Sequence, residues 1–69
     1  MNNWKNYETW NIALWISNDK VLYDLASKCK DYASLLHYLG SHETKDGVSY
    51  SDPKLCINEL DEFIRGLYD

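Results

Sequence analysis

The chain has 69 residues, of which 45% are hydrophobic and 14% aromatic, and its formal charge is −4 at pH 7. This length predicts one domain, residues 1–69, and the apolar content argues against a disordered chain. The acidic balance argues against direct nucleic-acid binding, because phosphate contacts need clustered Lys and Arg. No stretch approaches the roughly 18 apolar residues of a membrane span, and no signal-peptide core is present. We therefore expect a cytoplasmic protein with no membrane partner.

The first predicted helix runs from Tyr7 to about Ser17. Asn6 precedes it and can cap it, and Glu8 falls in its first turn. A helix that is apolar on nearly every side has to be surrounded, either by its own chain or by a partner. The apolar residues lie in three directions: Tyr7, Trp10 and Leu14 on one side, Ala13 and Ile16 on a second, and Ile12 and Trp15 on a third.

Two further helices are predicted in the middle of the chain. Ser17-Asn18-Asp19 indicates a break and a new cap before a helix at about 20–29. A third helix is predicted from near Asp31 to Leu39, with Gly40 after it as a residue that tolerates positive φ. Residues 28–31 either separate the two helices or bend a continuous one. The residues expected to be buried in the earlier helix are Val21, Leu22, Leu25, Ala26 and Cys29.

The rest of the chain predicts one irregular stretch and a final helix. Asp46-Gly47 indicates a turn, and the alternation around Val48 and Tyr50 allows a brief extended piece. Asn58 is the expected cap of the last helix, whose apolar stripe is Leu60, Phe63, Ile64 and Leu67. The predicted fold class is all-α: a small bundle of three to four short helices around a central N-terminal helix, with an irregular loop at about 40–56.

The sequence contains no set of residues that predicts catalysis, and we expect no enzymatic activity, no cofactor and no metal. A nucleophile needs a base within hydrogen-bond reach and a group that orients the base. Cys29 with His37 is the nearest pairing, but Cys29 lies on an apolar arc, which predicts an inert thiol. The Cys and His residues have no recognised zinc-ligand spacing. Glu59 and Glu62 share a helix face, as carboxylates do on many solvated helices.

The aromatic residues allow two interpretations. We expect Trp10 to lie in the core, whereas Trp4 and Trp15 fall on other sides and are either core or interface. Three indoles and six phenols are difficult to enclose in a domain of this size. An exposed patch around Ile12 and Trp15 would suit a partner or a second copy of the chain.

The polar residues of the first helix are equally open to two readings. Glu8, Thr9 and Asn11 interrupt an otherwise apolar helix. They either support the helix start and the packing of the first turn, or they recognise a ligand. The candidate partner-binding residues are Trp4, Glu8, Asn11, Ile12 and Trp15.

Residues 4–19 resemble the opening of a family of small uncharacterised proteins from bacteriophages and bacteria. The shared residues are Asn6-Tyr7-Glu8-Thr9-Trp10, Leu14-Trp15 and Asn18-Asp19. Residues 44–53 and 59–65 are also similar to that family, particularly to its cyanophage members. Tyr50 stands where those relatives often have Trp. The resemblance implies a phage or mobile-element source and no established activity, so no catalytic residue is transferred from it.

These observations favour a non-enzymatic, phage-encoded protein that binds a host protein and changes its activity, in host takeover or counter-defence. The first alternative is a structural homodimer whose N-terminal helix is buried against its twin. The second is an acidic mimic of nucleic acid, whose binding would weaken as salt is raised. Nothing in the sequence identifies the host partner.

Overall fold

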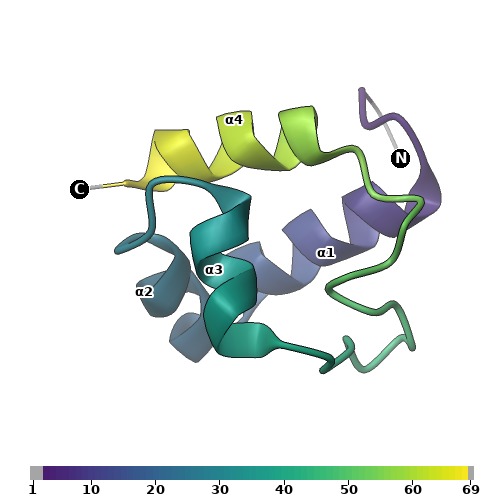
Figure 1. Ribbon diagram of the computed structural model, residues 1–69, viewed down its shortest axis with the longest axis horizontal. Helices are drawn as coiled ribbons and strands as arrows, with labels where there is room; N and C mark the ends of the chain where they lie inside the picture. The colour runs from purple at the N-terminus through teal and green to yellow at the C-terminus, as the bar shows by residue number, and fades with distance from the viewer. Residues whose placement is uncertain (1–2, 69) are drawn as a thin grey trace.

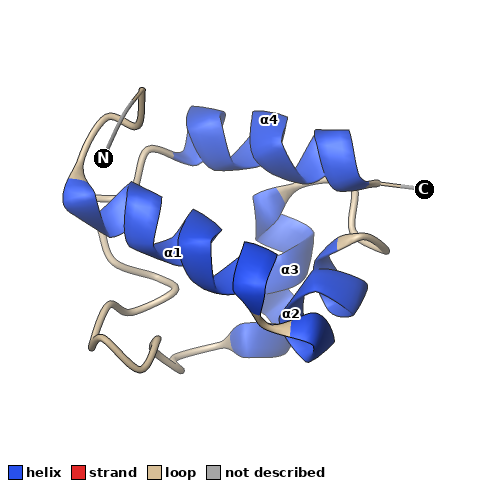
Figure 2. Cartoon of the chain, turned by 180° about the vertical axis from the view of Figure 1, so that it is seen from behind, coloured by secondary structure: helices blue, strands red, loops and turns tan. Residues whose placement is uncertain are grey.

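The computed structural model describes residues 3–68, and the predicted all-α fold is confirmed for this part of the chain (Figure 1). The helices are α1 (Tyr7–Asn18), α2 (Lys20–Ala26), α3 (Tyr32–Leu39) and α4 (Ile57–Leu67). α1 and α4 lie side by side and run in the same general direction, and α2 and α3 pack near the far end of α1 (Figures 1 and 2). The molecule measures 27 × 23 × 20 Å.

Side-chain caps set the first helix boundaries as the sequence predicts. Asn6 Oδ1 accepts from the Thr9 N–H at 2.9 Å and starts α1. Asp19 ends α1 and also caps α2, because its Oδ1 accepts from the N–H groups of Val21 and Leu22 at 2.9 and 3.1 Å. Two helices therefore meet at one extended residue, and the chain turns sharply there.

The core face of α1 differs from the one expected. Ile12 and Ile16 have no exposed surface, whereas Trp10 is only half-buried and Tyr7 is 42% exposed. The prediction that Trp10 lies in the core is wrong, and Ile12 belongs to the core and not to an exposed patch with Trp15. A helix that is apolar on every side gives no preferred direction, so its neighbours α2 and α4 decide which side is covered.

α2 ends earlier than predicted. The chain turns after Ala26, with the Cys29 N–H bonded to the Ala26 carbonyl at 3.0 Å, so Cys29 is buried from a turn instead of a helix. Val21, expected in the core, lies in the first turn of α2 and is 76% exposed. α3 follows the prediction: Asp31 caps it and Gly40, with φ of 58°, ends it.

α4 begins one residue before its predicted cap. Ile57 is its first residue and Cys56 precedes it without a side-chain capping bond, so the prediction that Asn58 caps the helix is wrong. The amphipathic pattern itself is confirmed. Leu60 and Ile64 have no exposed surface, and Phe63 and Leu67 are partly buried against the same core.

The loop between α3 and α4 is irregular, as expected, but it is also part of the core. Thr44, Val48, Tyr50 and Leu55 are all buried. Thr44 N–H donates to the Val48 carbonyl at 2.8 Å, and Gly47 turns the chain with φ of 88°. Among residues 3–68, the extended pairing amounts to an isolated antiparallel bridge between Glu43 and Ser49. None of the helices in this range has the length and apolar character of a membrane crossing.

The reversed exposure of Ile12 and Val21 gives a direct test of this packing. Ile12→Val removes one methylene from a fully buried site and should cost about 0.5–1.5 kcal/mol of unfolding free energy. Val21→Ala removes more side chain from an exposed site and should change it by less than about 0.5 kcal/mol. Urea unfolding followed by far-UV circular dichroism measures both. A larger cost for Val21→Ala than for Ile12→Val would contradict the assignment of the core face.

Candidate partner-binding surface

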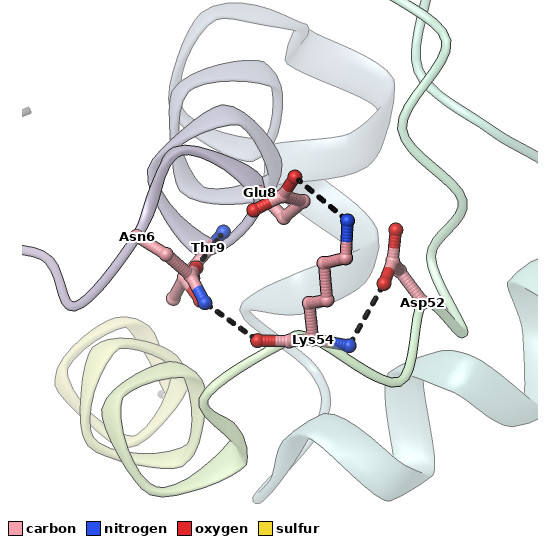
Figure 3. Close-up of polar contacts among 5 residues, drawn as sticks. All are labelled: Asn6, Glu8, Thr9, Asp52 and Lys54. Atoms are coloured by element: carbon pink, nitrogen blue, oxygen red, sulfur yellow. Dashed lines mark hydrogen bonds and ion pairs between the residues drawn. The ribbon is translucent and has the colours of Figure 1, made fainter.

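The polar residues at the start of α1 hold the end of the long loop (Figure 3). Asn6 Nδ2 donates to the Lys54 carbonyl at 2.7 Å, while Asn6 Oδ1 accepts from the Thr9 hydroxyl at 2.6 Å. The Thr9 Oγ1 in turn accepts from the Cys56 N–H at 2.9 Å. One buried hydroxyl therefore fixes the residue that leads into α4.

Glu8 also meets this part of the loop. Its carboxylate lies 4.0 Å from Lys54 Nζ, and the Lys54 N–H donates to Asp52 at 2.8 Å (Figure 3). The Lys54 side chain is mostly exposed, so the ion pair contributes at most about 1 kcal/mol. Glu8 is occupied within the chain but remains reachable from solvent.

Asn11 organises the middle of the loop from a site with no exposed surface. Its Nδ2 donates to Asp46 Oδ2 at 2.8 Å, and its Oδ1 accepts from the Thr44 hydroxyl at 2.7 Å. Trp15 Nε1 donates to the same Asp46 oxygen at 2.9 Å. We call these bonds, together with those of Asn6 and Thr9 to Lys54 and Cys56, the α1–loop network.

The network also perturbs the ionisation of Asp46. Hydrogen bonds from Asn11 and then Trp15 favour the charged form and lower the pKa of the Asp46 carboxyl, against a smaller opposing effect of burial. The carboxylate is thus held in place by two neutral donors from one helix.

The five residues predicted to bind a partner do not form one surface. Asn11 and Ile12 are fully buried, so neither offers a contact surface. Trp4, Glu8 and Trp15 remain partly exposed. Trp4 and Trp15 line two separate hollows with no lining residue in common.

The first hollow, which we call the Trp15 groove, lies between α1, α2 and the loop. It measures about 340 Å³, and Lys45 Nζ lies over the Trp15 ring at 5.8 Å from its centroid. Its walls are largely apolar near α2 and polar near the loop. The lining residues are Trp15, Asp19, Val21, Leu22, Leu39, His42, Glu43, Thr44, Lys45 and Tyr50.

The second hollow, the Trp4 groove, lies between the N-terminal segment and α4. It measures about 380 Å³ and is lined by Asn3, Trp4, Glu59, Glu62 and Phe63. The spacing of Glu59 and Glu62 predicts that they share a helix face, but nothing in the sequence connects them with Trp4. The signal for that connection was absent, because it depends on how residues 3–5 pack against α4.

The Cys29 thiol is bonded to the backbone and not to His37. Cys29 is buried, and its Sγ donates to the Leu25 carbonyl at 3.4 Å. Burial, helped by the charge of Asp31, raises the pKa of the Cys29 thiol and disfavours the nucleophilic thiolate. His37 is exposed on α3, with its ring against that of Tyr38 at 5.7 Å.

A family model matches residues 1–39, more than half of the chain. The chain belongs to DUF7249, a family of unknown function. The expectation of an uncharacterised family is therefore confirmed. The DUF7249 match covers α1 to α3, including Asn6, Thr9 and Asn11, but it stops before the loop that these residues hold. No curated protein and no solved structure gives a significant match.

The lowered pKa of Asp46 predicts how the stability of this DUF7249 protein depends on pH. The contribution of an Asp with a depressed folded-state pKa is complete above the unfolded value of about 3.9 and is lost as pH falls through the folded value. Asp46→Asn should therefore be less stable than wild type at pH 7, and the difference should shrink below about pH 4. Urea unfolding at several pH values from about 2 to 7 measures this difference in unfolding free energy between the two proteins. A difference that stays constant over this range would contradict the role of the Asp46 charge.

Proposed function

We propose that this protein is a small, non-enzymatic, phage-encoded protein that binds a host protein in the host cytoplasm and modulates its activity. The observation that carries the proposal is Trp15, a large ring left partly exposed at a groove although the chain has a closed core elsewhere. Trp is among the residues most enriched at the centres of protein interfaces.

The surroundings of Trp15 support a preformed binding surface. Its indole N–H is held by Asp46, so the ring loses little freedom when a partner covers it. Val21 lines the same groove and is 76% exposed, which places an uncovered aliphatic side chain beside the ring. Covering both would remove apolar surface from water, at about 25 cal/mol per Å².

The alternative of a homodimer joined through α1 has less support than the groove. The sequence allowed α1 to be covered either by its own chain or by a partner, and its residues Ile12, Ala13 and Ile16 are buried within the chain itself. The host-binding proposal therefore rests on the groove and not on an uncovered helix.

Affinity capture from a lysate of the natural host tests the proposal. Wild-type chain should retain a specific protein that dissociates at least about tenfold more readily from Val21→Glu, because a charge then enters the apolar part of the Trp15 groove. Trp15→Ala should have the same effect but also breaks the bond to Asp46, which is why Val21→Glu is the cleaner variant.

Tyr38→Ala is the matched control, since Tyr38 is an aromatic residue 65% exposed on α3 and lines no part of this groove. It should retain the partner like wild type. Recovery of no specific protein, or equal retention by wild type and Val21→Glu, would refute the proposal.

A further inference from the structure

The Trp4 groove combines two fixed aromatic rings. Trp4 and Phe63 meet edge to face, with ring centroids 5.8 Å apart and planes at 78°. Both are partly buried against the core, so each ring is held on one side and open on the other. The hollow between them and α4, about 380 Å³, is large enough for one long side chain.

Two carboxylates line the same hollow. Glu59 and Glu62 lie three residues apart, on one face of α4. The Lys5 N–H donates to Glu59 Oε1 at 2.8 Å and orients that carboxylate, while Glu62 is exposed. Within residues 3–68, the ion pairs join Lys20 with Asp24 and Lys54 with Glu8, so neither groove carboxylate is neutralised by a Lys or Arg of this range.

The two grooves differ in whether a cationic side chain of the protein itself lies over the Trp ring. Lys45 of the chain itself lies over Trp15. In the described part of the chain, no Lys or Arg occupies the corresponding place over Trp4 or Phe63. The Trp4 groove thus offers aromatic faces and unneutralised negative charge together, in a chain whose net charge is already −4.

We propose that the Trp4 groove binds an arginine side chain presented by a partner protein, a proposal that rests on the host-binding function above. A guanidinium can stack on an aromatic face and donate two parallel N–H bonds to a carboxylate, and it is less strongly hydrated than an ammonium. A neutral apolar side chain would lie beside the two carboxylates without donating a hydrogen bond to either. The negative charge of the groove and its aromatic faces therefore both favour the planar guanidinium of arginine.

The test uses the full ¹⁵N-labelled chain at low ionic strength and two short peptides, acetyl-Gly-Arg-Gly-amide and the same peptide with citrulline, the neutral isostere of arginine. The arginine peptide should shift the Trp4 indole signal and the amides of Glu59, Glu62 and Phe63, and should bind about fivefold more tightly than the citrulline peptide. The Trp15 indole signal is the internal control and should not move.

Glu62→Gln should weaken arginine binding by about two- to fivefold with the spectrum otherwise unchanged, because Glu62 is exposed. Asp24→Asn removes the same charge from an exposed position on α2 that lines neither groove, and it should leave the affinity as in wild type. Equal binding of both peptides, shifts spread evenly over the acidic surface, or equal weakening by both variants would overturn the assignment.

The titration contains no host protein, so its failure is separate from failure of the host-binding proposal. Capture of a partner by a chain that shows no arginine preference would refute only the groove assignment. An arginine preference in a chain that captures nothing would refute the host-binding proposal and leave the groove as an arginine site.

Discussion

Thr9 and Asn11 carry polar side chains with no exposed surface, and both lie on the helix at the centre of the fold. A buried hydroxyl or amide left without a hydrogen bond costs about 1–3 kcal/mol, so these two side chains constrain whatever packs against them. Thr9 takes its partners from Asn6 and Cys56, and Asn11 from the loop residues Thr44 and Asp46. Among the described residues, every buried side-chain nitrogen and oxygen has a partner. The position of the loop is therefore set by the hydrogen bonds that the buried side chains of Thr9 and Asn11 require.

The position of the loop then determines the core and the surface. Val48, Tyr50 and Leu55 complete the core from the loop, and the Tyr32 hydroxyl donates to the Tyr50 carbonyl. Asp46 holds the Trp15 ring at the edge of one groove, while the lead into α4 places Glu59 and Glu62 beside Trp4 in the other. Asn6, Thr9 and Asn11 thus shape both grooves mainly through the loop. These side chains therefore have a structural role in this chain.

Local signals in the sequence predict the starts of α1, α2 and α3 and the end of α3, because Asn6, Asp19, Asp31 and Gly40 act on neighbouring backbone groups. The end of α2 and the start of α4 carry no such signal and were predicted incorrectly. The core-facing side of α4 is also predictable from the sequence, since its apolar residues share one face. The buried face of α1 could not be predicted in the same way. A helix that is apolar on all sides gives no preferred face, so its neighbours determine which side is buried, and the prediction for Trp10 is wrong for this reason. Of the candidate site, Trp4 and Trp15 were identified, but their partners Phe63 and Asp46 lie 59 and 31 residues further along the chain. Such pairings depend on tertiary contacts that no local pattern encodes.

The most direct test of the central claim is amide hydrogen exchange in Thr9→Val and Thr9→Ser. Valine keeps the shape but loses the acceptor for the Cys56 N–H, whereas serine keeps the hydroxyl. In Thr9→Val, the amide of Cys56 should exchange about tenfold faster or more while that of Ile16 in α1 keeps its protection. Thr9→Ser should resemble wild type. Unchanged exchange at Cys56 in Thr9→Val, or equal loss of protection at Ile16, would contradict the account.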